Sequence, residues 1–410
     1  MDCNRILICA IILGLLGFSA PLHASEHVPD EHIAAKFGIE FAQNYLEASQ
    51  VYNEMWALFP RSTGGEPEYP MYYGGHFFCE KGKFNLNIVD AFTQEAEAGV
   101  FAELLKKDYV EVRTVRFSHK ALIGVLDEIR RFVVSNPDSE LKIAAWGIDS
   151  PNNMVVVQVQ GYSETVDTAF KRNVIDSPMV RLEEGKPVGA LVPRAYEKSA
   201  ICENVAHLQS GERIFIGQHG FSAGYPAVRG EESGFVTALH GLPLEGQAVR
   251  LGSASGAVVG KVTAPICFSG SADGAFISLH QADFNQMVDG RTLISSNNRP
   301  SQGMILVSAS TPPDGTMRTQ RNIVVTNAHF NANMGGGLVL TDMIQTTGYA
   351  LYGESGGLVF RPVGSDAQTQ GVIVGSEIAS AKGDNMFFAW AGAIDSAIDV
   401  TQESGSAAFH

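Results

Sequence analysis

Apolar residues in the front half of the chain recur with the spacing of an α-helix. Ser118 is a good helix N-cap. The apolar residues after it fall at relative positions i, i+3, i+4, i+7 and i+10: Leu122, Val125, Leu126, Ile129 and Phe132. One apolar stripe of this kind predicts an amphipathic helix. The segments that follow read in turn as strand, strand, helix and strand, over 143–148, 154–159, 163–172 and 179–182. The α-β-β-α-β order predicts a small α+β module, and helices are also expected at 32–58 and 95–107.

The pattern changes at Gly211. Short β-prone runs then alternate with Gly, Pro, Asn and Asp turns, for example at 214–216, 234–238, 248–251, 303–307, 323–325, 358–360 and 371–374. Many short strands at this spacing predict an all-β barrel or sandwich. The chain has 410 residues, which favours two or three domains. Its net charge of -15 makes a nucleic-acid binder that relies on phosphate contacts unlikely.

Residues 1–24 resemble a secretory signal. Arg5 precedes an apolar stretch from Ile6 to Phe18, and Ala24 is a small residue at the expected cut. The alternative is a membrane anchor, but a bilayer span needs about 20 apolar residues. We therefore expect a secreted protein that begins at Ser25 and does not bind a membrane once the signal is removed.

The cysteines predict little cross-linking. Cys3 and Cys9 belong to the signal, so Cys79, Cys202 and Cys267 remain and allow at most one disulfide within the chain. We interpret them mainly as buried small apolar groups. The sequence has no CxxC spacing, and the segment around His27 and His32 lacks the HExxH pattern, so no metal or other cofactor is expected.

Three segments of the back half carry candidate chemistry. Ser355 lies in the turn Gly353–Gly357, His240 ends the β-prone run 234–239, and Asp273 precedes an apolar strand. Taken singly, each has a structural reading: a glycine-rich turn, a structural histidine and a strand-start cap. Together they supply a serine nucleophile, an imidazole base and a carboxylate that orients the base. The His–Asp–Ser order is that of chymotrypsin-type enzymes.

The sequence resembles the chymotrypsin-fold (trypsin-like) serine endopeptidases of the streptogrisin and alpha-lytic protease type. Segment 234–241, GFVTALHG, is similar to the family's GFLTAGH motif, and segment 353–357, GESGG, is similar to GDSGG. Residues 344–347 and 383–388 also resemble the family. Residues 145–149 and 153–157 resemble its pro-region. The resemblance covers roughly residues 115–400.

The resemblance implies a role for each candidate residue. His240 would be the general base, Asp273 its orienter and Ser355 the nucleophile, with the backbone N–H groups of Gly353 and Ser355 forming an oxyanion hole. It also implies two six-stranded β-barrels with the site between them, after a pro-region that assists folding and is cut away. The expected organisation is a signal peptide, an α+β pro-region and a protease domain, over residues 1–24, 25–185 and 186–410. The cut is expected between Glu183 and Gly211.

This sequence departs from the family's pattern at three places. Gly241 stands where a cysteine usually follows the histidine, and no cysteine lies in residues 341–355, so the customary disulfides are missing. Glu354 replaces the usual aspartate before the serine; it can still form a buried ion pair, but its extra methylene shifts the loop. Asp273 is followed by Gly274 instead of an aromatic residue. A second histidine motif ends at His329, but it comes too late in the chain to belong to the first barrel.

The resemblance also places a substrate pocket. Its floor would lie near Tyr349 and one wall along Val374, Gly375 and Ser376. Because no aspartate stands at the floor, we expect an apolar or aromatic P1 residue instead of Lys or Arg. The expected partners are a protein or peptide substrate and the chain's own pro-region. The alternatives are an inactive secreted binding module with this fold, and an esterase, which is disfavoured because a GxSxG elbow leading into a helix is absent.

Overall fold

The computed structural model describes most of the chain after residue 29. The described ranges are 30–61, 67–107, 109–190, 207–242, 244–280, 282–296, 298–312, 318–377 and 385–405. The predicted signal peptide and Cys202 lie outside them. Within these ranges, no helix combines the length and apolar character that a bilayer crossing requires. We call residues 30–190 the front part and residues 207–405 the back part.

The front part begins with two helices and a small sheet. The helix predicted over 32–58 is divided at Gly38, whose φ of 93° is unfavourable for other residues. The helix predicted over 95–107 is wrong beyond Ala98, because Gly99 has an extended backbone (φ −89°, ψ −164°). The elements are α1 (Glu31–Phe37), α2 (Ile39–Leu58), β1 (Tyr73–Phe78), β2 (Phe84–Val89), α3 (Thr93–Ala98) and β3 (Val110–Val115). The three strands form a sheet in the order β1-β2-β3.

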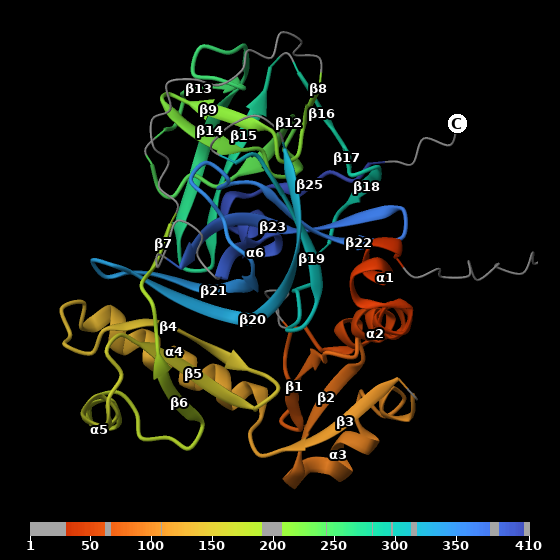
Figure 1. Cartoon of the computed structure of the whole chain (residues 1–410), viewed down its shortest axis with the longest axis vertical. Coiled ribbons are helices and arrows are strands. Elements are labelled where there is room, and N and C mark those ends of the chain that lie inside the picture. Colours follow the sequence, from red (N-terminus) through yellow and green to blue (C-terminus); the bar gives the residue numbers. More distant parts are fainter. Residues whose placement is uncertain are drawn as a thin grey trace, which may run out of the picture.

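The predicted α-β-β-α-β module follows. The Ser118 side chain caps its first helix by accepting a hydrogen bond from Ala121 N at 3.2 Å. Leu122, Val125 and Ile129 on that helix are buried in one cluster with residues of the two strands that follow. The module comprises α4 (His119–Ser135), β4 (Ile143–Asp149), β5 (Met154–Val159), α5 (Glu164–Asn173) and β6 (Val180–Glu184). Short strand β7 (Val188–Ala190) leads away from it towards the back part (Figure 1).

The first barrel of the back part has six strand positions, because β10 and β11 follow each other in the sequence and share one position. β10 pairs with β9, and β11 pairs with β12. The pairings β9-β13-β14-β15-β12 close the barrel. The strands are β9 (Arg213–Ile216), β10 (His219–Ser222), β11 (Pro226–Arg229), β12 (Glu232–Thr237), β13 (Ala248–Leu251), β14 (Val258–Ser269) and β15 (Ala272–Leu279). β8 (His207–Gln209) and β16 (Asp283–Asn285) form a separate parallel pair.

The second barrel also closes on itself, through the pairings β19-β20-β21-β24-β23-β22-β19. Its strands are β19 (Ile305–Ser310), β20 (Thr319–Gly335), β21 (Leu338–Thr347), β22 (Leu358–Val363), β23 (Asp366–Glu377) and β24 (Asn385–Trp390). Accessory elements are β17 (Met287–Val288), β18 (Arg291–Ile294), α6 (Ala391–Ile398) and β25 (Thr401–Gln402). The predicted all-β fold, a double six-stranded barrel after an α+β region, is confirmed.

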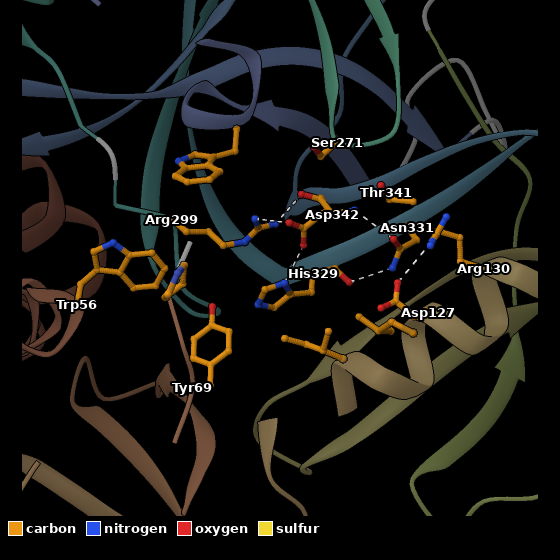
Figure 2. A pocket seen from close by; sticks show the side chains of 14 residues that line it. Trp56, Tyr69, Asp127, Arg130, Ser271, Arg299, His329, Asn331, Thr341 and Asp342 are labelled. Carbon is orange, nitrogen blue, oxygen red and sulfur yellow. Dashed lines mark hydrogen bonds and ion pairs between the residues drawn. The ribbon is translucent and has the colours of Figure 1, made fainter. Parts of the chain in front are cut away.

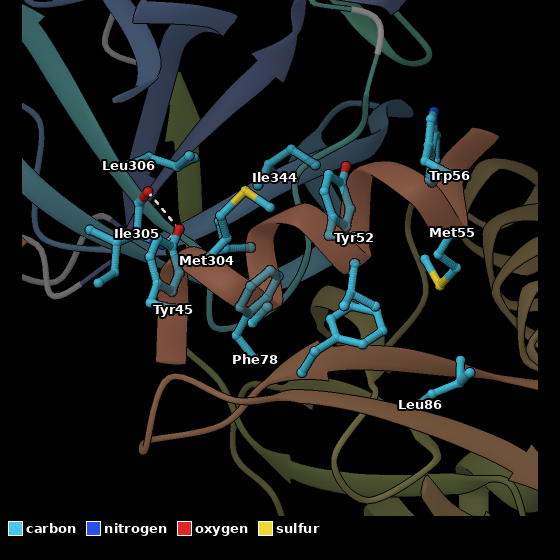
Figure 3. Close-up of a cluster of buried hydrophobic side chains, with 14 of the residues drawn as sticks. Tyr45, Tyr52, Met55, Trp56, Phe78, Leu86, Met304, Ile305, Leu306 and Ile344 are labelled. Atoms are coloured by element: carbon cyan, nitrogen blue, oxygen red, sulfur yellow. Dashed lines mark hydrogen bonds between the residues drawn. The ribbon is translucent and has the colours of Figure 1, made fainter. Parts of the chain in front are cut away.

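The front part lies against the second barrel (Figure 1). Backbone pairing and side-chain packing both join the two. β4 extends the barrel's sheet by pairing with β20, through Trp146 with Asn331 and Ala145 with Ala332. An apolar core is also shared: residues of α2 pack with Met304 and Ile344 of the back part. Figure 3 shows the hydroxyl of Tyr45 beside the carbonyl oxygen of Ile305 in the barrel, to which it donates at 3.2 Å. The same hydroxyl accepts from Ile305 N at 2.9 Å.

The cysteine interpretation is wrong in part. Cys79 and Cys267 are free thiols, and both are half-buried instead of lying in the core. Cys79 comes directly after β1 in the front part, whereas Cys267 belongs to β14 of the first barrel.

Candidate active site

Segments of both barrels bring the candidate side chains together at the boundary between the barrels. His240 comes three residues after the end of β12, with a positive φ of 51°. Asp273 is the second residue of β15, which pairs with β12 in the same barrel. Ser355 lies in the loop that connects β21 to β22 of the second barrel. Residues that are far apart in the sequence therefore meet only because both barrels close.

The His240 imidazole bridges the other two side chains. Its Nδ1 lies 2.5 Å from Asp273 Oδ2, and its Nε2 lies 2.7 Å from Ser355 Oγ. With Nδ1 carrying a proton and donating a hydrogen bond to the carboxylate, Nε2 is free to accept the serine proton. The three side chains thus form a continuous chain of hydrogen bonds, through which the imidazole can take the proton of the serine hydroxyl.

The aspartate is held from several directions. Its Oδ1 accepts hydrogen bonds from Leu239 N at 3.2 Å and His240 N at 3.0 Å, which leaves Oδ2 for the imidazole. Asp273 and Ser355 are fully buried, and His240 is 8% exposed. The Phe268 ring lies edge-on to the imidazole, with ring centroids 5.7 Å apart. Because the three side chains are buried, the electrostatic interactions between them are stronger than they would be in water.

The serine loop is tied to both barrels. Ser222 N, on β10 of the first barrel, donates to Ser355 O at 2.8 Å. Gly356 N donates to Ile373 O, on β23 of the second barrel, at 2.9 Å. A side chain on Gly356 would overlap Thr237 Oγ1, since a Cβ built there lies 2.0 Å from that atom. A glycine at this position therefore lets the loop pack closely against β12.

Glu354 anchors the same loop through an ion pair, as expected for this fully buried side chain. Its Oε1 lies 2.8 Å from Arg321 Nη2 and also accepts from Ser310 Oγ at 3.0 Å. Its Oε2 accepts from Leu351 N at 2.7 Å, closing the turn before the serine. The sequence did not identify Arg321 as the partner, because it stands in no motif and β20 brings it to the loop only in the folded barrel.

Close contacts on two sides restrict the backbone at Gly353. Its φ is +87°, and a Cβ built on it would lie 2.0 Å from Nη1 of Arg213. Its carbonyl oxygen accepts from Ser222 Oγ at 3.0 Å, which fixes the orientation of the peptide between residues 353 and 354. The Arg213 guanidinium is itself buried and donates to Thr311 O at 3.3 Å. Sequence motifs gave no signal for either Arg213 or Ser222.

The residues predicted to form the substrate pocket lie beside the serine loop. Ser376 Oγ donates to Ala350 O at 3.5 Å, so the predicted wall and the segment of the predicted floor are in contact. The Arg321 guanidinium lies over the Tyr349 ring, 4.8 Å from its centroid. Strand β7 of the front part runs antiparallel along the wall, with Ala190 opposite Gly375 and Gly189 opposite Ser376. Val374, the remaining wall residue, is buried on β23.

His329 lies in a different environment. Its Nδ1 is 2.8 Å from Asp342 Oδ1, and its ring packs against that of His119 in the front part, with centroids 5.0 Å apart. His329 is therefore part of the junction between the front part and the second barrel. Among the described residues, no three His, Cys, Asp or Glu side chains are grouped as a metal ion requires.

One family model matches a segment of the front part. Residues 120–185 match a family model described as the Pro-like C-terminal domain. The match covers most of the α-β-β-α-β module.

Solved structures similar to the chain include several serine proteases. Protease A of Thermobifida fusca is 21% identical, with a TM-score of 0.38, covering 49% of this chain and 100% of its own. The chymotrypsin of Cellulomonas bogoriensis is 19% identical, with a TM-score of 0.38, covering 48% of this chain and 100% of its own. An alpha-lytic protease homologue, N4, is 15% identical, with a TM-score of 0.36, covering 48% and 99%. All three TM-scores are below 0.5, so the chain's own strands and side chains carry the interpretation.

Proposed function

We propose that the chain is the precursor of a secreted serine endopeptidase. The observation that carries this proposal is the imidazole of His240 lying between Asp273 Oδ2 and Ser355 Oγ at 2.5 and 2.7 Å. An inactive binding module with the same fold has no use for this alignment. It is the alternative against which the proposal is tested.

The proposed reaction proceeds through an acyl-enzyme. Ser355 Oγ attacks the carbonyl carbon of the scissile peptide while His240 Nε2 takes the hydroxyl proton. The negative charge that develops on the carbonyl oxygen is stabilised by the N–H groups of Gly353 and Ser355. The C–N bond then breaks, and the amine leaves with the proton from His240. Water, deprotonated by the same imidazole, hydrolyses the ester and regenerates the serine. Asp273 holds the imidazole in the required tautomer and stabilises its charged form.

Ser355→Ala and His240→Ala test these roles. Each should lower kcat for a peptide substrate by about 10⁴–10⁶-fold while leaving the circular dichroism spectrum unchanged. Ser355 should also be the residue that an active-site-directed fluorophosphonate labels. His329→Ala is the matched control, and it should retain turnover because its imidazole does not contact Ser355. Peptidase activity that survives Ser355→Ala would contradict the proposal, and a wild-type protein without any hydrolytic activity or labelling would favour the binding module.

Strand β7 supports a proposal for the substrate. It pairs antiparallel with the predicted pocket wall, with Ala190 opposite Gly375, and we propose that a substrate peptide binds to this strand in the same way. A bound peptide in this register would place its next residue opposite Val374. That position is one residue from Ile373, whose carbonyl accepts the hydrogen bond from Gly356 N beside the serine. The peptide bond after that next residue would thus be presented to Ser355.

In this chain the residue after Ala190 is Leu191, which lies outside the described residues. We therefore propose that the bond between Leu191 and Val192 is cut during maturation, and that the pocket accepts an apolar P1 side chain. N-terminal sequencing of the secreted protein should give Val192 as its first residue, and Ser355→Ala should be secreted uncut. A different N-terminus on an active enzyme would overturn this cut site and leave the endopeptidase proposal standing.

We also propose that the front part assists folding. The barrels are built from non-local strand pairs, which form slowly, and their many glycines lose much backbone entropy. β4 and α2 supply a pre-formed edge and apolar face to the second barrel. Residues 192–410 refolded alone should stay inactive and should gain activity when the front part is added in trans. Efficient refolding of 192–410 without it would contradict this role.

A further inference from the structure

Three histidines meet at the junction between the front part and the second barrel. His76 lies on β1 and His119 begins α4, both in the front part, whereas His329 lies on β20 of the barrel. They line one small cavity of about 20 Å³ to which both parts contribute. The rings of His119 and His329 are in contact across the junction, with centroids 5.0 Å apart. The candidate active site uses none of the three.

The surroundings of the three histidines disfavour a protonated imidazole. Aromatic rings surround His119, with the centroids of Tyr69 and Tyr73 at 4.7 and 5.2 Å from that of the imidazole. His76 Nδ1 is hydrogen-bonded to the Tyr73 hydroxyl. Within the described part of the chain, His76 Nε2 and His119 Nδ1 are buried and have no hydrogen-bond partner. A protonated imidazole has two N–H donors, and a buried donor without an acceptor is costly.

Among the described residues, the carboxylate that faces the cluster is already paired with other groups. Asp342 on β21 is the facing carboxylate, and His329 Nδ1 lies 2.8 Å from its Oδ1. Its Oδ2 lies 2.7 Å from Arg299 Nη1, so the carboxylate is already shared with a guanidinium. The next charged pair, Asp127 with Arg130 on α4, lines the neighbouring open pocket of about 340 Å³ (Figure 2). Each of those two side chains is about half exposed, so solvent screens the pair.

Burial shifts all three histidines in the same direction. It lowers the pKa of His76 to about 3, with the nearby His329 contributing. It lowers the pKa of His119 well below the ordinary value, and both other histidines add to this shift. The pKa of His329 is also lowered, by burial and then by Arg299, against the opposing effect of Asp342. The docked junction therefore disfavours the charged form of all three imidazoles.

We propose that this histidine cluster is an acid-sensitive latch: the front part stays docked on the second barrel while the three imidazoles are neutral, and separates from it when acid protonates them. The proposal is independent of the peptidase function. In the separated state the imidazoles are hydrated and titrate near 6.5. Because the docked state excludes the proton, docking weakens as the pH falls from about 6.5 towards 3. For a histidine with the shift of His76, the ratio of separated to docked protein rises about 30-fold at pH 5.

The two free thiols allow a direct measurement. Cys79 belongs to the front part and Cys267 to the first barrel, so a donor and an acceptor dye on them report on separation. The protein is the full chain with Ser355→Ala, to keep it uncut, and with serine replacing Cys3, Cys9 and Cys202. Energy transfer should be constant above pH 7 and fall reversibly between about pH 6 and 4, while the β-sheet circular dichroism persists.

His119→Phe is the decisive variant, since phenylalanine keeps the ring contacts and removes a titrating group. At pH 5 its ratio of separated to docked protein should be clearly lower than that of the parent, because burial holds the pKa of His119 well below the ordinary value. His329→Phe makes the same test from the barrel side and is independent of how the front part folds. The matched control is His280→Phe, at an exposed position, which should follow the parent.

Three results would overturn the latch. One is energy transfer that stays constant to pH 4, and another is a pH profile that neither His119→Phe nor His329→Phe changes. The third is loss of the circular dichroism in step with energy transfer, because that would mean unfolding of the whole chain. None of these measurements uses peptidase activity, so failure of the latch and failure of the proposed function are distinguishable.

Discussion

Removing the guanidinium of Arg321 should destabilise the loop that carries Ser355. Glu354, next to that serine, has a fully buried carboxylate, and Arg321 Nη2 lies 2.8 Å from its Oε1. Arg321→Met keeps much of the aliphatic side chain. Among the described residues it leaves the carboxylate with hydrogen bonds from Ser310 Oγ and Leu351 N. We expect lower stability and, because the loop is displaced, much weaker peptidase activity.

The size of the effect follows from the distance and the burial. Two unit charges 2.8 Å apart attract each other by about 6 kcal/mol at an effective dielectric constant of about 20. Removing one partner of a buried ion pair typically costs about 3–5 kcal/mol. The Arg321 side chain is 21% exposed, so solvent already screens part of its charge. We therefore expect a loss of about 3 kcal/mol in the free energy of unfolding.

Urea denaturation, followed by circular dichroism, measures this free energy. The comparison uses Ser355→Ala as the parent, so that self-cleavage does not complicate the transition. Glu354→Gln and the double variant complete a mutant cycle, and the double variant should be more stable than the sum of the two single losses implies. The matched control is Lys106→Met, which removes an exposed pair at 2.7 Å from Glu103 and should cost at most about 0.5 kcal/mol. An Arg321→Met protein as stable as this control, or with wild-type kcat/KM in the Ser355 background, would refute the reasoning.

Three further outcomes are expected. Gly353→Ala should lower kcat at least about 100-fold, because the residue has a φ of +87° and the new methyl group would overlap Arg213; unchanged turnover of a model peptide would contradict this. Burial raises the pKa of Asp395 to about 6, so its contribution to stability is complete below pH about 4 and is lost as the pH rises through 6. Denaturation between pH 4 and 7 should therefore show a decline of up to about 3 kcal/mol that Asp395→Asn lacks, and parallel curves would count against it. Tyr45→Phe should cost about 1–3 kcal/mol in urea denaturation, because the hydroxyl that bonds both Ile305 N and Ile305 O would be lost; stability equal to that of the parent would show that the bonds contribute nothing.

Local sequence signals predicted those elements whose determinants are local. The Ser118 cap and the apolar stripe after it fix α4, and alternating turns and β-prone runs give the barrels. The same reasoning failed at Gly38 and Gly99, where a glycine interrupts a segment whose apolar spacing still reads as helix. It also missed β3, whose residues are largely exposed and which forms by parallel pairing with β2.

In the candidate site, too, the sequence predicted the residues that lie in local motifs and missed those that only the folded chain brings together. The glycines around Ser355 and the run that ends at His240 are local features, so the sequence singled them out. The groups that hold the loop come from elsewhere, since Arg321 and Ser222 reach it only after both barrels have closed. No spacing rule joins His119 to His329 either, because the two lie on different parts of the fold and meet only when these dock. Residue contacts made by docking leave no periodic trace in the chain.

The strand pair between β4 and β20 has a consequence for colloidal behaviour. A closed barrel has no free edge, but β20 is 17 residues long, and its Asn331–Ala332 segment offers one flank to the front part. Once β4 leaves, this flank presents backbone N–H and C=O groups that can recruit the same flank of another molecule. The docked front part thus acts as a shield against edge-to-edge association. After the front part has left, the two barrels should therefore be monomeric only in dilute solution. Concentrated preparations should self-associate through the Asn331–Ala332 flank of β20.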